Sequence, residues 1–157
     1  MRGMRLWSHR TNAVPGSIVI GRSGHRAHRE TLLASSAKTT VIVIDDDPSI
    51  CRALKTLLRI LGFEVVLFRT AEEMLAGTVP VEGACLLSDV YLPGMNGIEL
   101  CQLLSERGPH LPIILMTGRD DEHTKRLMRA AKPIASLFKP FDEADLLRAI
   151  RKAGCPI

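Results

Sequence analysis

Three carboxylates, one hydroxyl and one ammonium follow short apolar runs in this sequence. Asp45 and Asp46 come after one run, Asp89 after a second, Thr117 after a third and Lys139 after a fourth. Phosphoryl transfer needs such a set: a nucleophilic carboxylate, and groups that neutralise charge on the phosphoryl oxygens. The pattern predicts an aspartyl phosphate at Asp89, with Thr117 and Lys139 facing it.

Carboxylates gathered at one place require a cation. Two like charges about 4 Å apart repel by about 4 kcal/mol at an effective dielectric constant near 20. Lys139 supplies one positive charge and a divalent cation would supply two. Mg²⁺ fits best, because it binds a few carboxylate or carbonyl oxygens and keeps several waters. The sequence therefore predicts Mg²⁺ beside Asp45, Asp46 and Asp89.

The elements that position these residues alternate between buried strands and amphipathic helices. Strands are expected at 41–44, 63–68, 84–87, 113–116 and 134–138, and helices from Pro48, from Thr70, over 98–107, over 120–131 and after Asp142. This alternation predicts an α/β fold with helices on both faces of a doubly wound, five-stranded parallel sheet, the flavodoxin-like (βα)5 arrangement. With strand order 2-1-3-4-5, ligands bind at the carboxyl ends of the strands, where the order reverses. The candidate residues then converge there.

Local signals support these helices unequally. Asp47 before Pro48 is expected to cap the first helix, and Thr70 to Glu73 form a capping-box pattern. The helix over 120–131 is the weakest, because its apolar side is little more than Leu127, Met128 and alanines.

Four motifs resemble those of CheY-like response-regulator receivers. They are Val41-Ile42-Val43-Ile44-Asp45-Asp46-Asp47-Pro48, Asp89-Val90-Tyr91-Leu92-Pro93-Gly94-Met95-Asn96-Gly97, Met116-Thr117-Gly118 and Phe138-Lys139-Pro140-Phe141. The resemblance covers about residues 40–153 and is closest to FixJ-type receivers. Any one motif is weak evidence, but four in order at strand ends are specific.

The resemblance implies a role for each residue. Asp46, Asp89 and the backbone carbonyl of Tyr91 would bind Mg²⁺ directly, and Asp45 would act through metal-bound water. Thr117, Lys139 and the Gly118 amide would bind the phosphoryl oxygens, and the Lys139–Pro140 peptide would be cis.

The resemblance also implies partners. The phosphodonor would be a histidine kinase or a histidine phosphotransfer protein, and phosphorylation would change the affinity for an unknown downstream protein. Because the sequence ends just past the fifth helix, we expect a single-domain response regulator, a monomer or weak dimer that does not bind DNA directly.

Two positions depart from the family pattern. Ser136 stands three residues before Lys139, where receivers usually have Phe or Tyr as a rotating switch. Ala131-Lys132-Pro133 replaces the usual Ala-Gly-Ala-like approach to the fifth strand, and Pro133 should stiffen that turn and shorten the weak helix.

Two other functions are open. One is an adaptor with the same fold that binds its partner irrespective of phosphorylation. The other is a Mg²⁺-dependent phosphatase of the haloacid-dehalogenase kind, which needs a second Asp two residues after the nucleophile. Tyr91 occupies that position, so turnover of outside substrates is disfavoured.

Composition divides the chain in two. Residues 1–40 carry seven Lys/Arg and one acid, a net charge of +6, whereas residues 41–157 carry fourteen Lys/Arg and sixteen acids, a net charge of −2. We expect residues 1–39 to be a basic, poorly ordered extension and residues 40–157 to be the receiver domain.

The extension resembles a transit peptide in composition, and a nucleic-acid or membrane-tethering arm is a further alternative. We favour either a start codon placed too far upstream or an extension without function.

The rest of the composition indicates a cytoplasmic protein. No apolar run is long enough to span a membrane. Cys51, Cys85, Cys101 and Cys155 have no metal-like spacing, so we expect buried, reduced thiols.

Overall fold

A computed structural model describes residues 6–7 and 38–155. Its strands are β1 (Leu6–Trp7), β2 (Thr40–Ile44), β3 (Glu64–Phe68), β4 (Val79–Pro80), β5 (Ala84–Asp89), β6 (Ile113–Thr117) and β7 (Ala135–Phe138). Its helices are α1 (Pro48–Ile60), α2 (Ala71–Ala76), α3 (Gly97–Arg107), α4 (Glu122–Ala131) and α5 (Glu143–Lys152). Each of the five expected strands and five expected helices is present within a few residues of its expected range.

Five of the strands form one parallel sheet in the order β3-β2-β5-β6-β7. When only these five strands are numbered in chain order, the sheet has the expected order 2-1-3-4-5. The flavodoxin-like arrangement is therefore confirmed. Ile44, the last residue of β2, pairs with Phe68 on one side and with Ser88 on the other. The strand order therefore reverses at β2, and its carboxyl end lies beside that of β5.

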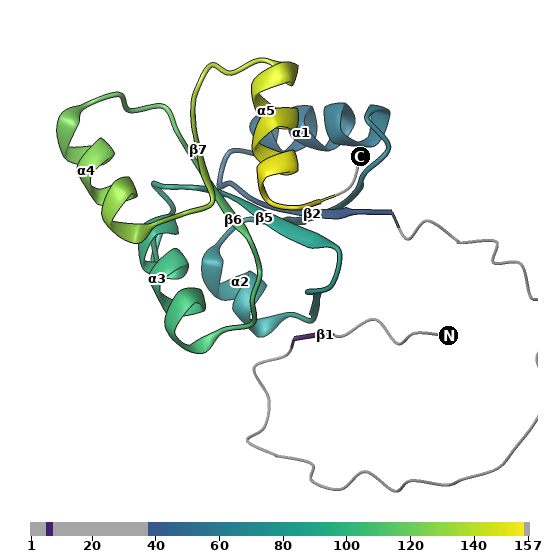
Figure 1. The fold of residues 1–157 in the computed structure, drawn as a ribbon, viewed down its shortest axis with the longest axis horizontal. Coiled ribbons are helices and arrows are strands. Elements are labelled where there is room, and N and C mark those ends of the chain that lie inside the picture. Colours follow the sequence, from purple (N-terminus) through teal and green to yellow (C-terminus); the bar gives the residue numbers. More distant parts are fainter. Residues whose placement is uncertain (1–5, 8–37, 156–157) are drawn as a thin grey trace, which may run out of the picture.

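Helices cover both faces of this sheet. On one face α1 and α5 pack on alternate residues of the central strands, such as Val43 and Leu87 (Figure 1). On the other face α2, α3 and α4 pack on the residues between them, such as Ile42 and Leu86. Because both faces are buried, the central strands β2, β5 and β6 are nearly continuous apolar runs, and the polar residues at their ends stand out in the sequence.

The local signals at the helix starts differ in detail from expectation. Asp47 caps α1 and Asp142 caps α5, as expected. At α2 the Thr70 side chain accepts from the Glu73 amide at 3.1 Å, but Glu73 accepts from the Arg69 amide instead of the Thr70 amide. Only half of the expected capping box is therefore formed.

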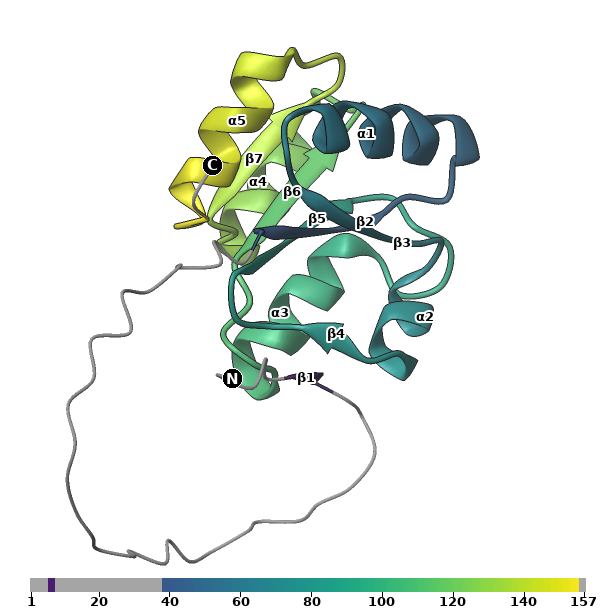
Figure 2. The same cartoon turned by 90° about the vertical axis from the view of Figure 1, so that its right-hand side faces the viewer.

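A second, two-stranded sheet was not expected. Leu6–Trp7 (β1) pairs antiparallel with Val79–Pro80 (β4), on the side of the main sheet that carries α2 and α3 (Figure 2). Apart from Leu6, Trp7, Lys38 and Thr39, the expected poorly ordered extension lies outside the described residues. All four cysteines are buried and free, as expected.

Candidate functional site

The carboxyl ends of four parallel strands bring the candidate residues together. Asp45 and Asp46 follow β2, Asp89 ends β5, Thr117 ends β6 and Lys139 follows β7. Lys139 Nζ lies 2.8 Å from Asp45 Oδ2 and 2.7 Å from Asp89 Oδ1. One ammonium therefore joins two carboxylates that are 44 residues apart in the sequence.

The three acids after β2 point to different partners. Asp45 is buried, and its second oxygen accepts from the Asp47 amide at 2.9 Å. Asp47 caps α1 by accepting from the Ser49 amide at 2.7 Å. The Asp46 side chain is exposed, while its carbonyl oxygen accepts from the guanidinium of Arg69. Helix capping thus accounts for Asp47 and leaves Asp45 and Asp46 for other tasks.

Backbone and side-chain hydrogen bonds in the loop after β5 fix the position of Asp89. Asp89 Oδ2 accepts from the Tyr91 amide at 2.8 Å, and the Ser88 hydroxyl donates to the Asp89 carbonyl at 3.0 Å. Gly97, at the start of α3, packs so closely on this segment that an added Cβ would overlap the Asp89 carbonyl oxygen. The loop from Asp89 to Gly97 is therefore tightly folded around the carboxylate.

Burial and ion pairing act in opposite directions on these charges. Burial raises the pKa of Asp89 above its ordinary value, although the hydrogen bond from Lys139 and the Tyr91 amide partly oppose this. Burial works against the charge of Lys139, but its hydrogen bonds to Asp45 and Asp89 outweigh it and raise the pKa of the ammonium. The site thus brings a single ammonium, that of Lys139, together with three carboxyl groups, two of which it contacts directly.

This donor set suits a hard divalent cation. Asp45, Asp46, Asp89 and the Tyr91 carbonyl offer oxygen atoms only, which is the ligand type that Mg²⁺ prefers. Within the described residues, no three His, Cys, Asp or Glu side chains form a ready-made metal cluster. Two of the three acids meet at Lys139, and the exposed carboxylate of Asp46 follows directly in the chain.

Thr117 and Ser136 lie on the side of the site nearest α4. Thr117 is completely buried, and its hydroxyl accepts from the Arg119 amide at 3.1 Å. Ser136, in β7, is exposed at the edge of a hollow of about 180 Å³ that Lys125, Met128, Arg129 and Phe138 also line. A small polar residue thus stands where receivers usually have an aromatic ring.

The sequence did not indicate a role for the Tyr91 side chain, only for its backbone carbonyl. Its hydroxyl lies 2.6 Å from the hydroxyl of Thr124 in α4, and the Arg119 guanidinium stacks on its ring, 4.1 Å from the centroid. The available signal was the spacing of Thr124, Met128 and Ala131, which share one face of a helix. Leu127, which the sequence pattern places on the apolar side of this helix, is 39% exposed, and Thr124 is buried instead.

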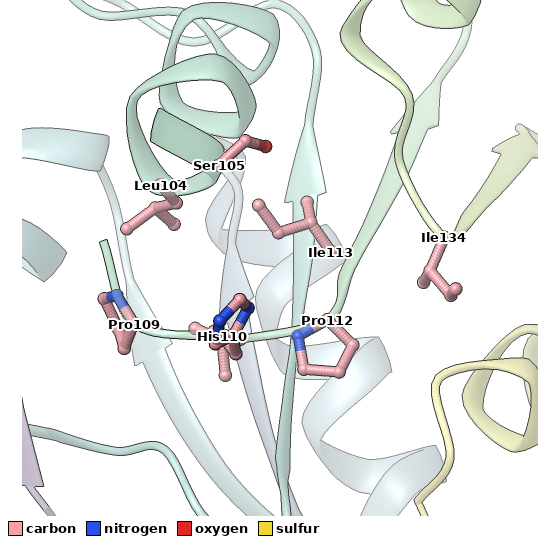
Figure 3. A pocket seen from close by; sticks show the side chains of 8 residues that line it. Leu104, Ser105, Pro109, His110, Pro112, Ile113 and Ile134 are labelled. Atoms are coloured by element: carbon pink, nitrogen blue, oxygen red, sulfur yellow. The ribbon is translucent and has the colours of Figure 1, made fainter. Parts of the chain in front are cut away.

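A separate hollow of about 360 Å³ lies at the opposite, amino end of the sheet (Figure 3). It is lined by Leu104, Ser105, Pro109, His110, Leu111, Pro112, Ile113 and Ile134. His110 is its only titratable side chain, so this hollow lacks the acids and the ammonium that converge at the other end.

Comparisons with known proteins agree on one family. A family model described as "Response regulator receiver domain" matches residues 41–151. Nodulation protein W of Bradyrhizobium diazoefficiens is 40% identical over 128 residues, which are 81% of this chain and 54% of that protein. The transcriptional regulatory protein FixJ of Azorhizobium caulinodans is 38% identical over 113 residues, 71% of this chain and 53% of that protein. This chain thus spans about half the length of these curated relatives.

A solved structure gives the same result for the fold. The crystal structure of FixJ-N superposes with a TM-score of 0.68 at 29% identity, covering 74% of this chain and 93% of that one. Among the described residues, no helix is long and apolar enough to cross a membrane.

Proposed function

The chain belongs to the response-regulator receiver family, and from that premise we propose that it accepts a phosphoryl group on Asp89 and thereby changes its affinity for a downstream protein. Receivers are signalling domains of two-component systems, and a receiver implies a histidine kinase or a phosphotransfer protein as donor. The observation that carries the proposal is the buried Asp89 carboxylate at the end of a central strand, 2.7 Å from the Lys139 ammonium.

In the proposed reaction Asp89 is the nucleophile. A lone pair of its carboxylate forms the new O–P bond while the P–N bond of a donor phosphohistidine breaks, and the electron pair of that bond returns to the imidazole nitrogen. Lys139 then shifts from the carboxylates toward a phosphoryl oxygen, and Thr117 and the Gly118 amide donate hydrogen bonds to the same group.

Asp45, Asp46, Asp89 and the Tyr91 carbonyl would hold Mg²⁺, Asp45 mainly through water. When bound, Mg²⁺ offsets the negative charge that builds up on the phosphoryl oxygens. The excess of acidic over basic groups in the site supports this assignment, because Lys139 alone cannot balance three carboxyl groups and an incoming phosphoryl group.

Further proposals concern the domain boundaries, the cellular location and the kind of partner. We treat residues 40–157 as the receiver domain, and we expect it to work in the cytoplasm beside its phosphodonor. Residues 41–157 carry a net charge of −2, which supports a protein target rather than direct DNA binding by this part of the chain.

The test is incubation with acetyl phosphate and Mg²⁺, followed by intact-mass measurement. We expect one phosphoryl group per chain, lost when Mg²⁺ is removed and absent from Asp89→Asn. A chain that stays unmodified while still binding its partner would point to the phosphorylation-independent adaptor. Sustained turnover of p-nitrophenyl phosphate would point to the phosphatase.

A further inference from the structure

The loop from Asp89 to Gly97, called the phosphorylation loop below, contains Tyr91, whose contacts join this loop to the loop after β6 and to α4. The Tyr91 amide donates to Asp89 Oδ2 at 2.8 Å, so its backbone is tied to the phosphoacceptor. Its hydroxyl reaches Thr124 Oγ1 at 2.6 Å, although 33 residues separate the two. Its ring also carries the Arg119 guanidinium, 4.1 Å from the centroid.

The donor and acceptor of each hydrogen bond made by the Thr124 hydroxyl can be assigned. Thr124 Oγ1 donates to Asp121 Oδ2 at 2.8 Å, and a hydroxyl has only one proton to donate. The Tyr91 hydroxyl must therefore be the donor to Thr124. Asp121 is the N-cap of α4 and also accepts from the Thr124 amide at 2.9 Å. The chain from Tyr91 through Thr124 thus ends on the carboxylate that holds the first turn of α4.

The contacts on the ring depend on Thr117. The Arg119 amide donates to Thr117 Oγ1 at 3.1 Å, so the position of Arg119 follows that hydroxyl. In the function proposed above, the Thr117 hydroxyl turns to a phosphoryl oxygen on Asp89. The Arg119 amide then loses its acceptor, and the guanidinium stacked on Tyr91 is free to move with its loop.

We propose that Tyr91 is the positioning residue that couples the state of Asp89 to α4 in this chain. In the resting state, the hydrogen bond from Tyr91 to Thr124 holds the amino end of α4 against the phosphorylation loop. Phosphorylation draws Thr117 away from Arg119, removes the guanidinium from the Tyr91 ring and breaks the bond to Thr124. This inference rests on the proposed function. It also supplies a route that needs no aromatic side chain at Ser136.

The test compares amide NMR shifts with and without beryllofluoride, which mimics a phosphoryl group on a carboxylate, in the full chain with Mg²⁺. Thr124→Val removes the hydroxyl with little change in shape and leaves every residue of the site in place. We expect the resting α4 amides of this variant to have moved toward their liganded positions, and their further displacement to fall about fivefold. Thr124→Ser keeps a hydroxyl and should restore the wild-type response. Tyr91→Phe should reproduce Thr124→Val.

The matched control is Thr56→Val in α1, since the Thr56 hydroxyl donates to the Arg52 carbonyl within its own helix at 2.9 Å. It should leave the α4 response unchanged. A wild-type response in Tyr91→Phe would overturn the proposal, even if Thr124→Val alone had an effect, because the effect would then arise at Asp121. If Thr124→Val unfolds α4, Tyr91→Phe decides the question, since this ring is partly exposed.

The same spectra separate this inference from the proposed function. Amides of Val90, Gly118 and Lys139 report whether beryllofluoride binds at Asp89. If these amides do not respond in the wild type, the proposed function fails. If they respond in all variants while α4 moves equally in all, only the role of Tyr91 fails.

Discussion

The three consecutive aspartates that follow β2 lie in three different environments. Asp45 is buried against Lys139, Asp46 is exposed, and Asp47 caps α1. Their order in the sequence predicted that some of them would be functional, and the proline at position 48 predicted the cap. The sequence did not predict that Lys139 pairs with Asp45 as well as with Asp89. This pairing depends on where the Lys139 side chain, which follows β7, lies relative to the carboxyl end of β2.

The first prediction separates Asp46 from Asp47. Asp46→Ala should abolish Mg²⁺ binding in a calorimetric titration, while the free energy of unfolding changes by less than about 0.5 kcal/mol, because the side chain is exposed. Asp47→Ala is the matched control: it should retain Mg²⁺ binding but lose about 1 kcal/mol of stability with its cap. Equal Mg²⁺ affinity in Asp46→Ala and the wild type would remove Asp46 from the metal site.

The second prediction concerns Asp89 and pH in metal-free buffer. Because burial raises the pKa of Asp89, the native state holds this proton more tightly than the unfolded chain does. The stability that this group contributes is present below its unfolded pKa of about 3.9 and is lost as the pH rises through the higher native pKa. Asp89→Asn should therefore be more stable than the wild type at neutral pH, with the difference vanishing in acid.

Urea unfolding at several pH values measures this difference. Glu106→Gln, which changes an exposed carboxylate on α3, should differ from the wild type by less than about 0.5 kcal/mol across this pH range. A difference between Asp89→Asn and the wild type that grows as the pH falls would have the wrong sign for a raised pKa.

Among the helices and strands that the sequence predicts, α4 departs most in which of its residues are buried. It begins at Glu122 after the cap Asp121, and its buried row is Thr124, Met128 and Ala131. Composition alone favoured Leu127 over Thr124 as a core residue, because a hydroxyl is buried only where it finds partners, and here they are Tyr91 and Asp121. The helix ends at Ala131 before Pro133, as expected, and Lys132 adopts a left-handed conformation with φ of 53°.

The third prediction uses this strained lysine. A left-handed backbone costs a residue with a Cβ about 1–2 kcal/mol, and glycine recovers most of this at the expense of a more flexible unfolded chain. Lys132→Gly should therefore stabilise the protein by about 0.5–1 kcal/mol in urea unfolding. Arg126→Gly, in the exposed middle of α4, should instead destabilise it by about 1 kcal/mol. Destabilisation in both variants would mean that the helix end is not strained.

In the whole molecule, the sheet and the ends of its strands could be predicted, but the contacts between loops could not. Each functional residue ends or follows a strand, and β2, β5 and β6 are buried apolar runs, so the pattern that predicts the fold also predicts most of the site. The pairing of β1 with β4 and the contact of Tyr91 with Thr124 join segments that are distant in the sequence and that no local pattern links. Both depend on how packed elements meet in space.

The fourth prediction concerns transmission across the molecule. Ser136→Tyr should place a ring in the hollow lined by Lys125, Met128, Arg129 and Phe138, and strengthen the response of α4 amides to beryllofluoride. A working switch couples its sites by about 1–3 kcal/mol, and we expect the wild type to lie at the low end. Ser105→Tyr, at the hollow on the opposite end of the sheet, is the control and should have no such effect. A full-sized wild-type response that Ser136→Tyr does not increase would contradict the expectation that Ser136 weakens the coupling, and would leave the route through Tyr91 untouched.

The most direct test of the central claim identifies the phosphorylated residue itself. The protein is treated with acetyl phosphate and Mg²⁺, the acyl phosphate is reduced with borohydride to homoserine, and the peptides are mapped by mass spectrometry. The account predicts homoserine at position 89 and unmodified aspartate at positions 45 and 46. Homoserine at Asp45 or Asp46, or no homoserine at all from a folded, Mg²⁺-binding protein, would contradict it.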